Sequence, residues 1–125
     1  MNYKLPEIIM DTIPERTERV ALPCSQGILW MERKRILWLQ SEGNYSWAHF
    51  ADGCKTLLPC LLKQLEAGLS PAGFYRIHHQ YVVNLNQLVR FEKADGGQVV
   101  LTDGTVLPVS RARKQGFLQK IYTVQ

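Results

Sequence analysis

Two adjacent histidines stand in the most polar of the strand-like segments, residues 74–84. Beside His78 and His79 this segment carries the cation Arg76 and the amide Gln80, groups that can bind phosphate oxygens or the base edges of nucleic acid. On a regular strand, side-chain alternation would place the two imidazoles on opposite faces, with Arg76 and Gln80 on the face of His78. This geometry argues against one metal held by both histidines, and no acidic neighbour completes a metal site. One histidine hydrogen-bonded at a sheet surface and the other exposed remains the plainer alternative.

A second polar cluster occupies residues 42–45, between two segments with strong strand character. Gly43 permits a sharp turn, and Asn44 presents a hydrogen-bond donor together with acceptors. Asparagine is a side chain that can pair with N6 and N7 of adenine in DNA. An ordinary turn explains the same residues equally well.

A third cluster, residues 108–114, precedes the C-terminal apolar pattern. Ser110 can cap a helix whose first free amides then face a phosphate. Arg111, Arg113 and Lys114 fall in the first turn of that helix, where cations are unfavourable unless an anion lies nearby. This local conflict indicates an anionic ligand, and a solvated basic patch is the alternative.

Short strands separated by turns are expected to position these clusters. Six segments rich in β-branched and aromatic residues have strand character: 19–23, 27–32, 35–40, 45–50, 87–93 and 98–102. Asp-Gly pairs at 52–53, 95–96 and 103–104 suit the tight turns of hairpins. The sequence therefore predicts a mostly β fold of antiparallel, hairpin-built sheets.

Two segments break the strand pattern. Residues 59–69 carry leucines at helical spacing and predict a short internal helix, which ends near glycine and proline. Residues 110–122 predict a C-terminal helix that Gly116 weakens. Residues 1–18 lack periodicity and are expected to be a leader or linker, so we place the domain at residues 19–125.

Composition sets the class of protein. The chain has 125 residues, 46% of them hydrophobic, which suits one folded domain. No apolar run is long enough to span a bilayer and the first residues lack a signal-peptide core, so a cytoplasmic protein is expected. Cys24, Cys54 and Cys60 form no CxxC pair and are expected to be reduced and mostly buried, with a redox role as the alternative.

Other aromatic and imidazole side chains are expected to be structural. Trp30, Trp38, Trp47 and Phe91 occupy core-like strand positions, and His49 follows the same pattern as a histidine with a structural partner. The second half of the chain carries all of the excess charge: residues 67–125 hold seven Lys or Arg against three Asp or Glu. Such asymmetry suits a face that binds a polyanion.

Together the three clusters, in this order, resemble the LytTR family of bacterial DNA-binding domains over roughly residues 18–122. The resemblance implies sequence-specific binding of duplex DNA in transcription regulation, as the output of a signalling system, with loops inserted into the major groove. It implies base contacts from Asn44, His79 and Arg111, and phosphate contacts from Arg76, His78, Ser110, Arg113 and Lys114. Position 79 departs from the family pattern, which favours arginine, lysine or asparagine there.

The expected partners are double-stranded DNA with paired repeats, a second copy of the chain on that DNA, and a receiver or sensor domain. We expect no enzyme, cofactor or metal, since the P-loop, GxSxG and HExxH motifs are missing from the sequence. Two alternatives remain open. One is a protein interaction module that docks an acidic partner on its basic β surface. The other is an enzyme with His78 or His79 as general base, which lacks a visible nucleophile or carboxylate in its motif.

Overall fold

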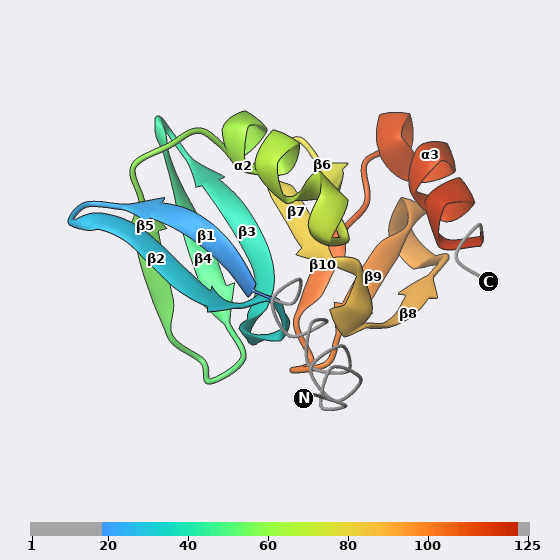
Figure 1. Ribbon diagram of the computed structural model, residues 1–125. Helices are drawn as coiled ribbons and strands as arrows, with labels where there is room; N and C mark the ends of the chain where they lie inside the picture. The colour runs from blue at the N-terminus through green and yellow to red at the C-terminus, as the bar shows by residue number, and fades with distance from the viewer. Residues whose placement is uncertain (1–18, 123–125) are drawn as a thin grey trace, which may run out of the picture.

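A computed structural model of the protein describes residues 19–122. Within this range the chain forms three antiparallel sheets and two α-helices (Figure 1). The strands are β1 (Arg19–Cys24), β2 (Gly27–Glu32), β3 (Ile36–Glu42), β4 (Tyr45–Phe50), β5 (Lys55–Leu58), β6 (Phe74–His78), β7 (Tyr81–Asn84), β8 (Leu88–Glu92), β9 (Gln98–Leu101) and β10 (Val106–Pro108). The helices are α2 (Leu62–Leu69) and α3 (Arg111–Tyr122). The predicted fold class is confirmed, while the expected leader, residues 1–18, lies outside the described residues.

The central sheet has the strand order β5-β4-β3-β7-β6. One of its faces packs against the β1–β2 hairpin and α2, which lie over it in Figure 1. The shared core of this layer contains Leu22 from β1, Leu39 from β3 and Leu65 from α2. Leucines at helical spacing therefore bury one face of α2 against the sheet, as their pattern predicted.

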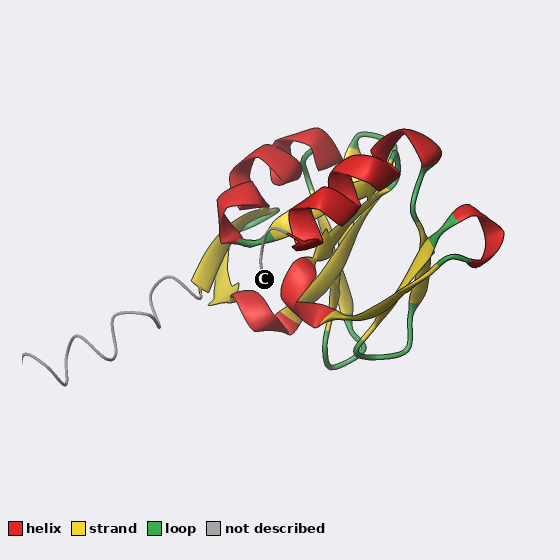
Figure 2. Cartoon of the chain, turned by 90° about the vertical axis from the view of Figure 1, so that its right-hand side faces the viewer, coloured by secondary structure: helices red, strands yellow, loops and turns green. Residues whose placement is uncertain are grey.

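The second core lies on the other side of the β3–β7–β6 end of this sheet. There the three-stranded sheet β10-β9-β8 and helix α3 pack against it through Val99, Leu107 and Phe117. β3 belongs to both cores, because Ile36 contributes to the first and Leu37 to the second. Figure 2 shows both helices beside the strands in a view from the α3 side.

Gly116 has a packing role in this second core. A Cβ atom at this position would stand 2.7 Å from the Tyr75 hydroxyl oxygen on β6. The glycine that weakens α3 as a helix thus leaves room for the Tyr75 hydroxyl against α3.

All three Asp-Gly pairs connect neighbouring antiparallel strands, as predicted. Gly53, Gly96 and Gly104 have φ angles of 89°, 86° and 91°, and Asp95 adopts 55°. These are left-handed conformations that glycine and aspartate tolerate best. The turns therefore set the hairpin connectivity locally.

Several expectations about single residues were wrong. Trp30 is 56% exposed, because alternation on β2 turns its neighbour Met31 into the core and Trp30 outward. In contrast, Trp38 and Phe91 are half-buried and pack against the second core, as expected, and Trp47 is half-buried. Cys54 is an exposed free thiol in the β4–β5 turn, where its backbone N–H donates to Asp52.

In the part of the chain that the structure describes, no helix is both long and apolar enough to cross a membrane.

Candidate nucleic-acid interface

The three polar clusters meet along one edge of the molecule, the upper edge in Figure 1. This loop edge consists of the β3–β4 turn at residues 43–44, the β6–β7 turn at residues 79–80 and the first turn of α3. Backbone hydrogen bonds hold the parts together: Ser41 N–H donates to Gln80 O at 3.0 Å, and Ser110 N–H donates to Ile77 O at 2.8 Å. Clusters about 35 residues apart in sequence are therefore fixed next to one another.

The β3–β4 turn exposes Asn44 without using it for backbone geometry. Glu42 and Tyr45 pair across the hairpin, and Gly43 takes the left-handed φ of 60°. Asn44 is exposed and keeps a negative φ. Since the turn does not require asparagine for its conformation, the amide side chain is available to a ligand.

The two histidines lie on a hairpin and not on one continuous strand, so the expected alternation fails. β6 ends at His78, β7 begins at Tyr81, and residues 79–80 form the turn between them. Register shifts between Arg76, paired with Val82, and His78, paired with Tyr81, which marks a β-bulge. As a result His79 and Gln80 project from the tip of the hairpin, where both are exposed.

His78 has a fixed tautomer at the base of this turn. Its Nδ1 accepts a hydrogen bond of 3.0 Å from the Gln80 backbone N–H, so the ring proton resides on Nε2. Burial lowers the pKa of His78, and the nearby charges of His79, Arg113 and Arg76 lower it further. At neutral pH the ring is an uncharged donor, suited to a hydrogen bond with a phosphate oxygen and unsuited to an ion pair.

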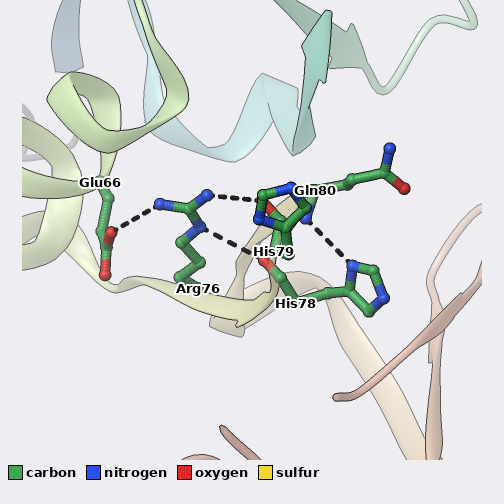
Figure 3. A network of polar contacts seen from close by, with 5 residues as sticks. All are labelled: Glu66, Arg76, His78, His79 and Gln80. Atoms are coloured by element: carbon green, nitrogen blue, oxygen red, sulfur yellow. Dashed lines mark hydrogen bonds and ion pairs between the residues drawn. The ribbon is translucent and has the colours of Figure 1, made fainter. Parts of the chain in front are cut away.

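Arg76 points inward from the same hairpin (Figure 3). Its Nη1 lies 3.3 Å from Glu66 Oε1, its Nε donates to His78 O at 3.3 Å, and its Nη2 donates to His79 O. Only 13% of the side chain is exposed. Three of the five guanidinium N–H groups, one on each nitrogen, thus have partners within the protein.

The start of α3 presents unpaired positive charge. Arg111 is the first helical residue and is exposed, and the first turn contains no acidic residue. Arg113 is half-buried near His78, whose pKa it lowers. Lys114 extends in another direction, with its Nζ 5.9 Å from the centre of the Phe91 ring.

Asn44, His79 and Arg111 are thus exposed, one on each of the three segments that make up the loop edge. Sequence analysis missed Lys63, an exposed cation at the start of α2. Lys63 lines the same concave surface as Gly43 and His79. It stands among leucines with ordinary helical spacing, so its position carried no signal.

His49 lies on the central sheet away from the loop edge and has the structural partners expected for it. Its ring stacks on Trp38 at 3.7 Å between centroids, and Nε2 lies 3.1 Å from Gln40 Oε1. Burial, the largest cause, and the charge of Lys55 lower the pKa of His49 to about 4, against a smaller opposing effect of Asp103. The folded protein therefore keeps His49 neutral at neutral pH.

We expect the free energy of unfolding to fall as the pH is lowered from 6.5 towards 4. In this range the unfolded chain protonates His49 while the folded protein does not, so protons favour unfolding. Urea unfolding at pH 7 and pH 4.5 measures the difference. His49→Gln should flatten this dependence and leave the part due to His78; an unchanged dependence would contradict the assignment.

Comparisons with known proteins point to a single family. Residues 26–122 match the sequence model described as the LytTr DNA-binding domain. The CO-responsive transcriptional regulator RcoM of Rhodospirillum rubrum is 29% identical over 103 residues, covering 80% of this chain and 43% of RcoM. An uncharacterized response regulatory protein of Vibrio cholerae is 35% identical over 86 residues, covering 66% of this chain and 33% of that protein. The chain thus spans less than half the length of these curated relatives.

The fold is shared with a solved structure. A LytTr DNA-binding domain from Bacillus cereus superposes with a TM-score of 0.69 at 17% identity, covering 82% of this chain and 94% of that domain. Within residues 19–122 no group of three or more His, Cys, Asp or Glu side chains is placed to hold a metal ion.

Proposed function

Because the chain belongs to the LytTR family of DNA-binding domains, we propose that it binds duplex DNA sequence-specifically and so regulates transcription. The observation that carries the proposal is that Asn44, His79 and Arg111 are all exposed on three segments that backbone hydrogen bonds hold side by side. Members of this family are regulatory DNA-binding domains and do not form a class of enzymes. A DNA-binding role of this kind belongs in the cytoplasm of a bacterium.

In this proposal the loops, and no recognition helix, enter the major groove. Asn44 reads adenine through its amide, His79 offers one donor and one acceptor, and Arg111 pairs bidentately with guanine O6 and N7. These three side chains come from separate elements, so each reads a different base pair. Specificity then depends on how the scaffold spaces them.

Phosphate contacts fix the register of the domain on DNA. We assign these to the Nε2–H of His78, to Ser110 at the start of α3, and to the cations Arg113 and Lys63. Lys114 joins them only if its side chain leaves Phe91, which it approaches in the free protein. For Arg76 the internal contacts favour a different role, developed below.

The width of the loop edge has a consequence for the DNA. With loops at both ends of the edge and a sheet between them, contact with two successive major grooves requires the duplex to bend. A single small domain buries a limited interface, so we propose paired sites occupied by two copies. The longer relatives, a transcriptional regulator and a response regulatory protein, support a receiver or sensor domain as a further partner.

Salt dependence tests the proposal. Affinity for any duplex should fall as salt rises, with a slope of about −0.9 in log–log form for each phosphate neutralised. Fluorescence anisotropy on labelled duplexes, over a salt range of about 50 to 300 mM, measures this slope. Arg113→Gln should flatten it by about one unit on all sequences alike.

An affinity that does not change with salt would contradict DNA binding. Absence of duplex binding, together with capture of an acidic protein surface, would favour the alternative of a protein interaction module. The basic start of α3 would serve that alternative equally well, so the duplex experiment decides between the two.

A further inference from the structure

One planar guanidinium holds two consecutive carbonyls of the β6–β7 hairpin. Arg76 Nε donates to His78 O at 3.3 Å and Nη2 donates to His79 O. Arginine can do this because its donors lie in one rigid fork, whereas lysine presents a single compact charge. Both carbonyls flank His79, a proposed base-reading residue.

The hairpin needs this support because its strand ladder is interrupted. The bulge at Ile77 shifts the register immediately before the turn, and a bulge leaves one residue without ladder pairing. Two other contacts assist: Gln80 N–H donates to His78 Nδ1, and Gln80 O accepts from Ser41 N–H. Arg76 holds the carbonyl oxygens of the turn, while the bond from Gln80 N–H to the His78 ring lies on the other side of the turn in Figure 3.

Glu66 fixes the other end of the guanidinium. It projects from α2, and its Oε1 lies 3.3 Å from Arg76 Nη1, with 37% of the Glu66 side chain exposed. Arg76 lines the same concave surface as Lys63 and His79, but a phosphate approaching it there would lie close to this carboxylate and would be repelled by it. The Arg76–Glu66 pair therefore argues against a phosphate contact by Arg76 and for a role in holding the β6–β7 turn.

We propose that Arg76 is a positioning residue that fixes residues 79–80 for base recognition, and that Glu66 orients Arg76 for this purpose. The inference rests on the proposed DNA-binding function and deepens it. It replaces the phosphate role that resemblance to the family implied for Arg76. Helix α2 thereby contributes to base specificity indirectly, through the contact of Glu66 with Arg76.

The first arm of the test uses the free protein. Amide hydrogen exchange measured by NMR should be roughly tenfold or more faster at Gln80 and Ser41, whose N–H groups bond within or to the turn, in Arg76→Gln and Glu66→Gln than in the wild type, since each change removes a charged hydrogen bond. Arg76→Lys should lose protection as well, because it keeps the charge without the fork. The control is Glu32→Gln, which makes the same charge change at an exposed position on β2.

The second arm measures DNA binding, for which simple electrostatics and the positioning role predict different effects of the same variant. Removing a negative charge by Glu66→Gln would by electrostatics alone strengthen or preserve binding, as Glu32→Gln should. The positioning role instead predicts a several-fold loss of discrimination at the one base pair that His79 reads. Arg76→Gln should show the same loss with an unchanged salt slope, and the two changes should not be additive in the double variant.

Three outcomes separate the possibilities. A salt slope reduced by about one unit in Arg76→Gln, with discrimination intact, would make Arg76 a phosphate ligand and overturn the inference. Identical behaviour of Glu66→Gln and Glu32→Gln in both arms would overturn it too. If the variants exchange faster as expected but the wild-type protein binds no duplex, the proposed function is refuted. The Arg76 contacts would then serve only the stability of the hairpin.

Discussion

Arg111→Lys is expected to relax the preference for guanine at one base pair of each half-site by about 1–3 kcal/mol, roughly 5- to 150-fold. Arg111 is the first residue of α3 and is exposed, and the first turn has no carboxylate to compete for its guanidinium. Lysine retains the positive charge and cannot form the two parallel hydrogen bonds to O6 and N7. Non-specific affinity should therefore stay nearly intact.

Competition binding against a panel of single-base variants of a selected duplex measures this effect. Arg113→Lys is the matched control, because it makes the same exchange two residues later at a proposed phosphate contact. Asn44→Ala should relax a different base pair, since Asn44 lies on another loop. Equal losses of Arg111→Lys on every duplex would show that Arg111 only holds phosphate.

Asn84→Asp is expected to reduce the free energy of unfolding by roughly 1–3 kcal/mol or more at pH 7, because the buried carbonyl of Ile36 loses its side-chain donor, whereas Arg33 O keeps the Ile36 N–H. Asn84 is fully buried at the end of β7. Its Nδ2 donates to Arg33 O at 3.1 Å and to Ile36 O at 2.9 Å. A carboxylate of the same shape would face both carbonyls with no proton to offer.

The loss should depend on pH with a defined sign. Burial against carbonyl oxygens raises the pKa of the introduced carboxyl above its unfolded value, so the folded variant holds a proton that the unfolded chain releases. The destabilisation relative to wild type should therefore grow as the pH rises from about 4 to about 7. An ordinary aspartate carboxyl titrates near the lower end of this range, and a buried one titrates higher. Urea midpoints of wild type and variant at several pH values test this. The exposed Asn86→Asp is the control, and an equal shift in that variant would contradict the assignment.

Local signals in the sequence determined the strands, turns and helices around the candidate interface. Asp-Gly pairs formed the expected turns because left-handed backbone geometry is a property of a few adjacent residues. The same holds for the helix after Ser110 and for the leucine face of α2. The three polar clusters were also recognisable as segments, since each is contiguous in sequence.

Short strands were less accessible to this reasoning. β5 and β10 have four and three residues, and pairing with longer neighbours defines them more than their own composition does. The β6–β7 hairpin turns at His79 and Gln80, and neither is one of the residue types usually found in tight turns. A two-residue connection of this kind follows from the pairing of its flanking strands.

The direction of each polar side chain was decided by tertiary structure. The sequence suggested a phosphate ligand at Arg76. In the structure Arg76 instead bonds to Glu66, ten residues away on α2, and to two carbonyls of its own hairpin. Asn44, with no such partner required by its turn, stays exposed for a ligand. A sequence lists which groups can form hydrogen bonds, but burial and the approach of distant elements determine which of those bonds are already made.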